Sequence, residues 1–237
     1  FIGDERAVYR ANLHLRFAER VFIKLGSFKA ESFEELFEGT RKLNWPDFIG
    51  RDDQFPVKGH SIKSKLFSIP DCQAIVKKAV VRSMTERYSI TQFPETGVKY
   101  QIEFFILNNI ATLMIDTSGI ALHKRGYRSH SLGAPIRETL AAAIAATSRP
   151  RENVLLWDPM CGSGTIAIEA AMMMKGIAPG RSRKFAAEDF AFIPKAVWKS
   201  AREEAKDGIR ATKFEVFASD IDPESVELTK KNAYKAG

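Results

Sequence analysis

The chain has 237 residues, of which 45% are hydrophobic and 27% are charged, and its net charge is +7. That is enough apolar material for one large or two small domains. Its two cysteines exclude a disulfide framework and a zinc site, so we expect a reducing compartment, the cytoplasm, and no metal; no apolar run reaches the length of about 18 residues typical of a membrane span, so no membrane partner is expected either.

The first half of the chain has alternating helical and extended patterning. Ser32, followed by Glu35 three residues later, has the spacing of a capping box at a helix start. Two later extended runs are separated by a short polar turn at 107–110, which predicts a hairpin. The predicted elements are helices at 7–16, 32–43 and 70–88, an extended segment at 57–65, and strands at 99–106 and 111–117.

Positive charge is concentrated in one part of the chain. Residues 57–128 carry eleven Lys and Arg against five Asp and Glu, whereas the segments on either side are nearly balanced. A local excess of this kind suits contact with a phosphate backbone. It is equally consistent with an ordinary solvated surface.

The most informative pattern begins after a connector rich in Gly, Ser and basic residues at 118–133. An alanine-rich helix is predicted at 135–147, packed on a strand that starts at Val154, ends at Asp158 and enters a turn with two glycines; a helix then reaches Met174. This layout places backbone N–H groups and a helix N-terminus at the carboxyl edge of a strand, where small anionic or zwitterionic ligands bind. The turn has neither the phosphate-binding GxxxxGK[ST] pattern nor the dinucleotide GxGxxG pattern. A ligand with a carboxylate, an ammonium and a ribose fits better, and a nicotinamide dehydrogenase is disfavoured.

A second strand, at 214–218, also leads to acidic residues. Asp222 followed by Pro223 predicts the N-cap and first residue of a helix that reaches Asn232. Asp220 is then left at the strand tip, where its carboxylate can accept hydrogen bonds from both hydroxyls of a ribose. The alternative is that both acids only cap the helix. Between the two strands, a basic loop at 178–183 precedes an amphipathic helix at 195–208.

Seven short motifs occur along the chain: KSKLFSIPDCQ at 63–73, LHKRGYR at 122–128, APIRETL at 134–140, DPMCGSGT at 158–165, IEAAM at 168–172, GIAPG at 176–180 and ASDIDP at 218–223. Together they resemble the class I S-adenosylmethionine-dependent methyltransferases. More narrowly, the chain resembles bacterial THUMP-domain RNA methylases, often labelled N6-adenine-specific DNA methylases, and the likeness covers essentially its whole length.

The resemblance implies an α/β fold with two parts. An α+β THUMP-like RNA-binding domain would occupy 1–117, with its N-terminal part missing, and a linker would occupy 118–133. The N-terminal part of a Rossmann-like methyltransferase domain would occupy 134–237. S-adenosylmethionine would lie over the turn, with its ribose on Asp220 and its adenine on Ile221. The implied cofactor residues are Asp158, Met160, Cys161, Gly162, Ser163, Gly164, Thr165, Asp220 and Ile221, with Pro135 and Thr139 closing the methionine side; the implied RNA-binding residues are Lys63, Lys65, Lys124, Arg125, Tyr127 and Arg128.

Three other features have simpler structural explanations. Cys161 is expected for its small size in a crowded turn, not as a nucleophile. His123 could be a general base, but RNA contact or local packing is the preferred interpretation. The three methionines at 172–174 are expected to fill a helix core.

The catalytic motif that the resemblance implies, Asn-Pro-Pro-Tyr, does not occur in the sequence. We therefore expect it beyond Gly237, and expect these residues to be a fragment that is not catalytically competent alone. The predicted reaction is methyl transfer to an exocyclic amino group of RNA, guanine N2 of 23S ribosomal RNA, with structured ribosomal RNA as the partner. The alternatives are an N6-adenine DNA methyltransferase and a non-catalytic RNA-binding module.

Overall fold

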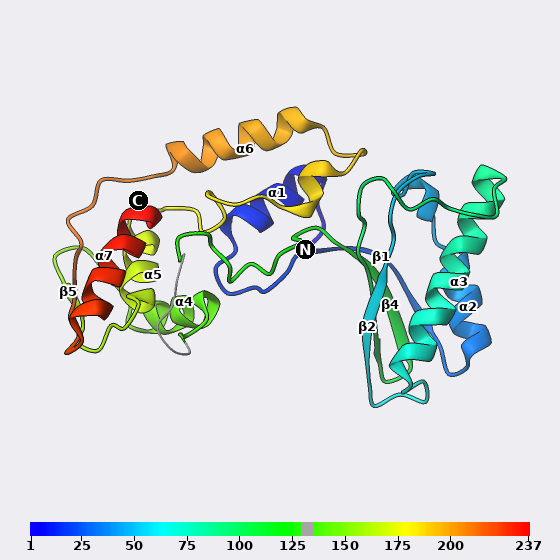
Figure 1. The fold of residues 1–237 in the computed structure, drawn as a ribbon, viewed down its shortest axis with the longest axis horizontal. Helices are drawn as coiled ribbons and strands as arrows, with labels where there is room; N and C mark the ends of the chain where they lie inside the picture. Colours follow the sequence, from blue (N-terminus) through cyan, green and yellow to red (C-terminus); the bar gives the residue numbers. More distant parts are fainter. Residues whose placement is uncertain (129–134) are drawn as a thin grey trace. The chain divides into compact units, whose positions relative to one another are not determined.

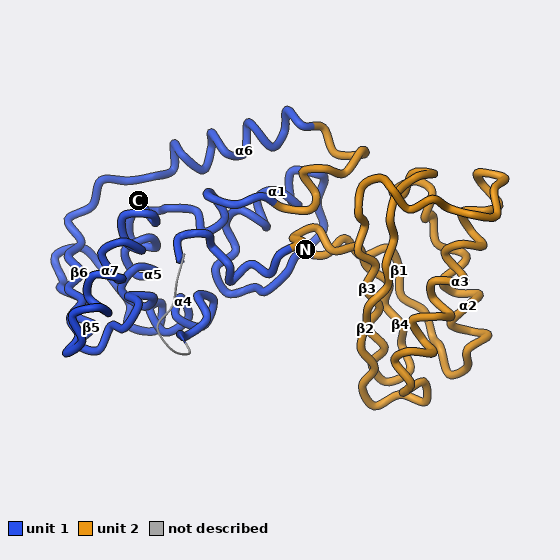
Figure 2. Tube along the Cα trace, viewed as in Figure 1, with its two compact units in different colours: residues 1–21, 120–184, 195–237 blue, residues 22–119, 185–194 orange. Residues whose placement is uncertain are grey.

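The computed structural model of the chain describes residues 1–128 and 135–237. It forms two compact units, each assembled from separate segments: residues 1–21, 120–184 and 195–237 make unit 1, and residues 22–119 and 185–194 make unit 2 (Figure 2). Residues 129–133 of the predicted linker, together with Ala134, lie outside the described residues. The domain boundaries expected from the sequence stay a prediction.

Unit 2 is a four-stranded sheet with two helices on one face (Figure 1). The strand order is β1-β4-β3-β2, in which β2 and β3 are parallel and the other pairs are antiparallel. The elements are β1 (Phe22–Lys29), α2 (Phe33–Arg41), the short 3-10 helix η1 (Trp45–Asp47), β2 (Val57–Ile62), α3 (Ile69–Tyr88), β3 (Ile102–Leu107) and β4 (Ile110–Asp116).

Local sequence signals account for the boundaries of these elements. The Ser32 hydroxyl accepts a hydrogen bond from the Glu35 N–H at 3.2 Å, so the predicted N-cap of α2 is confirmed. The Glu35 carboxylate, however, accepts from the N–H of Glu31 and not from that of Ser32. Asn108 and Asn109 both have positive φ, +50° and +63°, as a two-residue hairpin turn requires, and the predicted hairpin is confirmed. Strand β1 was not among the predicted elements.

The two faces of the sheet differ sharply. Alternate residues of β3, namely Ile102, Phe104 and Ile106, are fully buried under the helices. Gly59 of β2 belongs to the same face, and a Cβ placed on it would lie 2.4 Å from the Phe104 carbonyl oxygen and 2.5 Å from its ring. His60, the next residue along β2, is exposed on the opposite face. The parallel pairing of β2 with β3 therefore depends on the absence of a side chain at residue 59.

We predict that Gly59→Ala destabilises unit 2 by about 1–3 kcal/mol, because the added methyl must displace strand backbone and not a flexible side chain. Denaturant unfolding of the purified chain would measure this loss. His60→Ala, one position along the strand on the open face, is the matched control and should change the unfolding free energy by less than about 0.5 kcal/mol. Equal stability of the two variants would contradict the packing described here.

Residues 185–194, which contain the 3-10 helix η2 (Ala186–Asp189), complete unit 2 from a distant part of the chain. The Ala187 N–H donates to the Thr117 carbonyl at 3.0 Å. Phe190 stacks on Tyr100 with ring centroids 4.4 Å apart, and the Tyr100 hydroxyl accepts from the Ala191 N–H at 3.0 Å. This segment therefore caps one end of the sheet.

Unit 1 contains two parallel strands and five helices among its described residues. Strands β5 and β6 pair in register from Leu155–Glu215 to Asp158–Ala218. Helix α4 packs on α5, and not on β5 as predicted, because small buried alanines on both helices allow them to approach closely. The elements are α1 (Glu5–His14), α4 (Glu138–Thr147), β5 (Leu155–Asp158), α5 (Thr165–Met174), α6 (Lys195–Asp207), β6 (Glu215–Ala218) and α7 (Pro223–Ala236).

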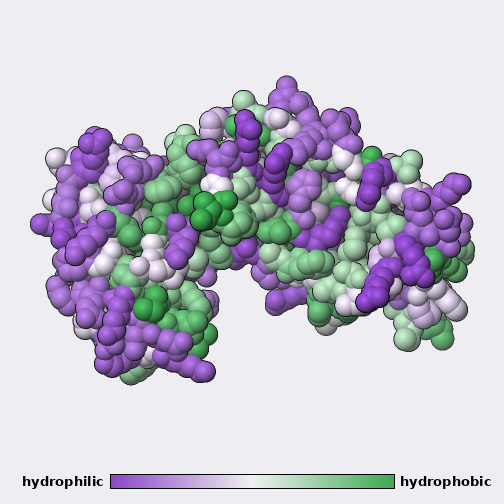
Figure 3. Space-filling view, turned by 180° about the vertical axis from the view of Figure 1, so that it is seen from behind, coloured by the Kyte–Doolittle hydropathy of each residue, from purple (hydrophilic) through white to green (hydrophobic). Residues whose placement is uncertain are grey.

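One face of the β5–β6 sheet is apolar and exposed. Leu155, Trp157 and Phe217 are 52%, 64% and 59% exposed, although strand residues of this kind are usually buried. The surface seen in Figure 3 mixes hydrophilic and hydrophobic residues. None of the described helices is both long and apolar enough to cross a bilayer.

Candidate functional site

The turn between β5 and α5 exposes backbone at the start of a helix. Gly162 and Gly164 have φ of +52° and +77°, conformations that side chains disfavour. Gly164 is the N-cap of α5, so no side chain caps the helix and the N–H groups of its first turn have no side-chain acceptor there. A Cβ on Gly162 would meet nothing within 4 Å. The turn therefore presents open space above a helix N-terminus, where an anionic group is favoured.

Helix α7 holds this turn through two side-chain hydrogen bonds. The Thr229 hydroxyl donates to the Gly162 carbonyl at 2.9 Å, and the Asn232 amide donates to the Ser163 carbonyl at 3.0 Å. Both α7 residues are buried. A Cβ on Gly164 would lie 2.6 Å from the Thr229 side chain, which explains the second glycine of the turn. Cys161 is buried with its Sγ 3.6 Å from the Thr229 hydroxyl, consistent with a packing role.

Asp220 is tied to the same turn by its carboxylate. One oxygen accepts from the Gly162 N–H at 2.8 Å and the other from the Asp222 N–H at 3.0 Å. The hydrogen bonds from these two backbone groups lower the pKa of Asp220, so it stays ionised at neutral pH. Asp222 caps α7 by accepting from the N–H groups of Glu224 and Ser225, as predicted. The two neighbouring acids thus have different environments.

Asp158, at the end of β5, differs electrostatically from Asp220. Partial burial raises the pKa of Asp158, and the nearby charge of Asp220 adds to this effect. The Ser219 N–H donates to the Asp158 carbonyl at 2.9 Å, which keeps the two strand ends adjacent. Met160 and Ile221, beside them, are 84% and 100% exposed. The structure therefore brings together the predicted residues from 158 to 165 with Asp220 and Ile221.

Thr139, one of the two residues predicted on the methionine side of the cofactor, is held by Glu19. The Thr139 hydroxyl donates to Glu19 at 2.6 Å, and the same carboxylate lies 2.7 Å from His123 Nδ1. Burial acts to raise the pKa of Glu19, but the hydrogen bonds from Thr139 and His123 outweigh it and lower that pKa. His123 is thus held by packing and by Glu19.

Arg128 links this region to the N-terminus of α5. Its guanidinium donates to the Thr165 hydroxyl at 2.7 Å and to the Ile136 carbonyl at 2.9 Å, and lies 3.6 Å from Glu138. The sequence had suggested that this arginine contacts RNA. Its contacts place it instead beside the first residue of α5.

Arg125 and Tyr127 are each only 2% exposed, which corrects their prediction as RNA-binding residues. The Arg125 guanidinium pairs with Glu169 at 3.4 Å and donates to the Leu122 carbonyl at 2.7 Å. The Tyr127 hydroxyl donates to Glu169 at 3.1 Å. Burial raises the pKa of Glu169 despite the neighbouring Arg125 and Arg16. Of the residues predicted at 124–128, only Lys124 is both charged and exposed.

Sequence reasoning missed Arg16 and Glu169 as the partners of this buried cluster. The Arg16 guanidinium donates to the carbonyls of Ile177 at 2.7 Å and Met172 at 3.3 Å. A signal was present, because Glu169 is the one charged residue in helix α5 and lies in its apolar stretch from Ile166 to Met174. An acid at such a position needs a buried cation or donor.

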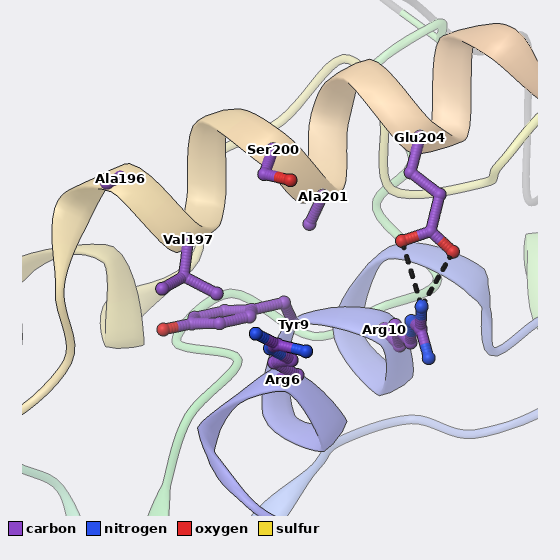
Figure 4. Close-up of a pocket in the computed structure, with 8 residues that line it drawn as sticks. All are labelled: Arg6, Tyr9, Arg10, Ala196, Val197, Ser200, Ala201 and Glu204. Atoms are coloured by element: carbon purple, nitrogen blue, oxygen red, sulfur yellow. Dashed lines mark hydrogen bonds and ion pairs between the residues drawn. The ribbon is translucent and has the colours of Figure 1, made fainter.

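A separate cavity of about 350 Å³ lies between α1 and α6. Arg10 and Glu204 form an ion pair across it at 2.9 Å, and Arg6, Tyr9 and Ser200 line it nearby (Figure 4). No residue of the predicted cofactor or RNA sites lines this cavity. Within the described residues, no group of three or more His, Cys, Asp or Glu is arranged to hold a metal ion.

Comparison with known families assigns the two parts of the chain. Residues 125–237 match the RMKL-like methyltransferase domain, and residues 30–116 match the THUMP domain. Residues 1–22 match the RlmL ferredoxin-like domain. The chain carries a THUMP domain and an RMKL-like methyltransferase domain.

Relatives and solved structures agree with this assignment. "Putative RNA methyltransferase YpsC" of Bacillus subtilis strain 168 is 46% identical over 240 residues, covering 100% of this chain and 62% of that protein. The crystal structure of a predicted N6-adenine-specific DNA methylase from Listeria monocytogenes is 48% identical over 99% of this chain and 62% of its own, with a TM-score of 0.95. A structure of SMU.472, described as "a putative methyltransferase complexed with SAH", is 40% identical over 99% of this chain and 63% of its own, with a TM-score of 0.91. The chain spans about 62% of the length of the curated relative.

The turn, Asp220 and the buried Glu169 all belong to the methyltransferase domain, whose class I α/β fold agrees with the prediction. The THUMP domain contains β2, β3 and β4 with helices α2 and α3. Its predicted RNA-binding residues, Lys63 and Lys65, are exposed directly after β2. Lys63 and Lys65 thus lie in a different domain from the predicted cofactor residues.

We predict that Thr229→Val lowers the free energy of unfolding of the methyltransferase domain by about 1–2 kcal/mol, because it keeps the side-chain shape but removes the hydrogen bond to the Gly162 carbonyl. Urea unfolding would measure the difference. Thr229→Ser retains the hydroxyl and should recover most of the loss. A valine variant as stable as the parent chain would show that the hydroxyl does not hold the turn.

Proposed function

We propose that the protein containing this chain is an S-adenosylmethionine-dependent methyltransferase that acts on RNA. The observation that carries the proposal is the uncapped N-terminus of α5 beside the ionised carboxylate of Asp220. A helix N-terminus binds anions, and a carboxylate accepts hydrogen bonds from hydroxyls. Together they match the carboxylate and the ribose of one ligand. The SAH in the related SMU.472 structure supports the same choice of cofactor.

The donors and acceptors present fit this cofactor. We assign its methionine carboxylate to the N–H groups of the first turn of α5, which have no side-chain cap, beside the open space at Gly162. Asp220 already accepts two backbone hydrogen bonds, but each carboxylate oxygen has a second lone pair for a ribose hydroxyl. The fully exposed Ile221 offers an apolar surface to the adenine. Arg128, which donates to Thr165, adds positive charge at the same helix end.

The chain's own part in the reaction is binding and orientation. When bound, S-adenosylmethionine supplies a methyl group already activated by its sulfonium. The turn and Asp220 would fix that group in one position, and positioning of this kind supplies much of the acceleration in such transfers. Thr229 and Asn232 would keep the turn in shape.

For the acceptor we propose an exocyclic amino group of RNA, guanine N2 of 23S ribosomal RNA. The THUMP domain and the name of the Bacillus subtilis relative support RNA. The guanine N2 target depends on the resemblance to ribosomal RNA methylases. A paired base would have to leave its stack to reach the cofactor. The printed description of the Listeria monocytogenes relative favours a second candidate, adenine N6 of DNA.

We predict that Asp220→Ala weakens S-adenosylmethionine binding to the 237-residue chain by about tenfold or more, because charged hydrogen bonds to hydroxyls are lost. Titration calorimetry with S-adenosylmethionine and with 5′-methylthioadenosine, which lacks the amino acid part, would measure both affinities. Both should fall together, since the two ligands share the ribose. Asp222→Asn, which keeps a helix cap, is the matched control and should bind both ligands normally. Unchanged affinity in Asp220→Ala would refute the ribose assignment.

The acceptor is tested with the complete gene product and methyl-labelled S-adenosylmethionine, offered unmodified ribosomal RNA and unmethylated DNA side by side. We expect label in RNA that digests to N2-methylguanosine and disappears with Asp220→Ala. Label in DNA as N6-methyladenine would overturn the acceptor but keep the cofactor site. No transfer to either, despite cofactor binding, would favour a non-catalytic RNA-binding module.

A further inference from the structure

The cavity between α1 and α6 lies between two parts of the chain that match different family domains. Helix α1 belongs to the stretch that matches the ferredoxin-like domain, and α6 belongs to the methyltransferase domain, yet both are in unit 1. The volume of about 350 Å³ is large enough for a small ligand, and such sites occur preferentially where domains meet.

Tyr9 gives this cavity a buried hydroxyl without a partner. Its side chain is fully buried and packs edge-on against Trp198, with ring centroids 4.4 Å apart. The Tyr9 hydroxyl nevertheless forms no hydrogen bond with any described residue. Burial, with smaller contributions from the charges of Glu5 and Asp4, raises the pKa of Tyr9, so the hydroxyl stays protonated and can donate. A buried donor without an acceptor costs free energy, which a ligand oxygen in the cavity would recover.

Two arginines on one side of α1 supply positive charge. Arg6 and Arg10 are four residues apart, so they lie on the same side of the helix, and both line the cavity. The Nη2 group of Arg10 donates to both carboxylate oxygens of Glu204, at 2.9 and 3.1 Å. Among the described residues, the Arg6 guanidinium has no hydrogen-bond or ion-pair partner. The lining residues therefore carry two cations against one anion, and the Arg6 guanidinium is free to bind a ligand.

The side of the cavity formed by α6 is mainly apolar and is lined by Ala196, Val197, Ser200 and Ala201. Figure 4 shows the Tyr9 ring extending toward the Val197 end of the cavity, whereas Arg10 and Glu204 meet at the other end. A ligand that fills this space therefore needs a charged group near the arginines and a small apolar body along α6.

We infer that this cavity binds a small organic phosphate, with the phosphate on Arg6 and Arg10 and with the Tyr9 hydroxyl donating to one of the ligand oxygens. A phosphate monoester carries nearly two negative charges at neutral pH and accepts hydrogen bonds from several directions, so it suits two guanidinium groups better than a carboxylate does. The bound ligand would connect α1 to α6. The inference goes beyond the proposed function and does not depend on it.

The test is an NMR titration of the 237-residue chain with 4-nitrophenyl phosphate, 4-nitrobenzoate and 4-nitrobenzyl alcohol, which differ in the group attached to the same ring. We expect the phosphate to bind more tightly than the carboxylate, and more tightly than the neutral alcohol by about tenfold or more. Arg6→Gln should weaken binding of the phosphate about tenfold. Arg151→Gln, at an exposed arginine of unit 1 that does not line the cavity, is the matched control and should bind as the parent chain does.

Tyr9→Phe supplies a second readout that separates ligand contact from packing. It removes only the unpaired hydroxyl, so without ligand the variant should resist urea at least as well as the parent chain. Its affinity for 4-nitrophenyl phosphate should nevertheless fall by about three- to tenfold. A less stable variant would show that the hydroxyl already has a partner, and unchanged affinity would show that the ligand does not reach it. Either result contradicts the inference.

Three other outcomes overturn the inference. The first is a phosphate probe that binds no better than the alcohol or the carboxylate, and the second is an equal loss of affinity in Arg6→Gln and Arg151→Gln. The third is a parent chain that does not bind the small phosphate although Arg6→Gln weakens its binding of single-stranded RNA, because Arg6 would then contact a polyanion. S-adenosylmethionine affinity, measured in the same variants, should stay unchanged, so a failure here is distinguishable from a failure of the proposed cofactor site.

Discussion

Three hydrogen bonds from distant residues determine the shape of the turn after β5. Its glycines give it conformational freedom, so its own sequence does not select one geometry. The Asp220 carboxylate accepts from one of its N–H groups, while Thr229 and Asn232 donate to its carbonyls. These contacts connect β6 and α7 to the turn. The candidate cofactor site therefore exists only once β6 and α7 have packed beside β5 and α5.

Elements with strong local signals were predictable from the sequence. Ser32 and Asp222 cap their helices through their own neighbours, and the two asparagines at 108 and 109 are residue types that tolerate the positive φ of a two-residue hairpin turn. Strand β1 was missed because its burial does not alternate cleanly, and its pairing with β4 shifts register between Lys24 and Gly26. A bulge of this kind breaks the two-residue period by which a strand is recognised.

Part of the candidate site was also predictable from local sequence signals. The residues from 158 to 165 and Asp220 follow strand ends, and parallel strand ends meet at one sheet edge. Arg125 was misread as an RNA-binding residue because its charge was counted without its buried partners. Glu169 lies 44 residues from Arg125 in sequence, and Arg125 also donates to the Arg16 carbonyl, 109 residues away. Whether a side chain such as Arg125 is buried depends on contacts between segments that are far apart in the sequence, and amino-acid composition does not reveal these contacts.

The interleaving of the two units has a consequence for the order in which the chain can fold during synthesis. The four strands of unit 2 are complete at Asp116, yet the Tyr100 side chain and the Thr117 carbonyl meet Phe190, Ala191 and Ala187 only when these later residues have emerged from the ribosome. Residues 1–21 likewise belong to unit 1, so they can pack with residues 120–184 only after that later segment has been synthesised. Unit 2 therefore cannot complete this end of its sheet until residues 187–191 have been translated, and α1 cannot complete its packing until the later segments of unit 1 have followed.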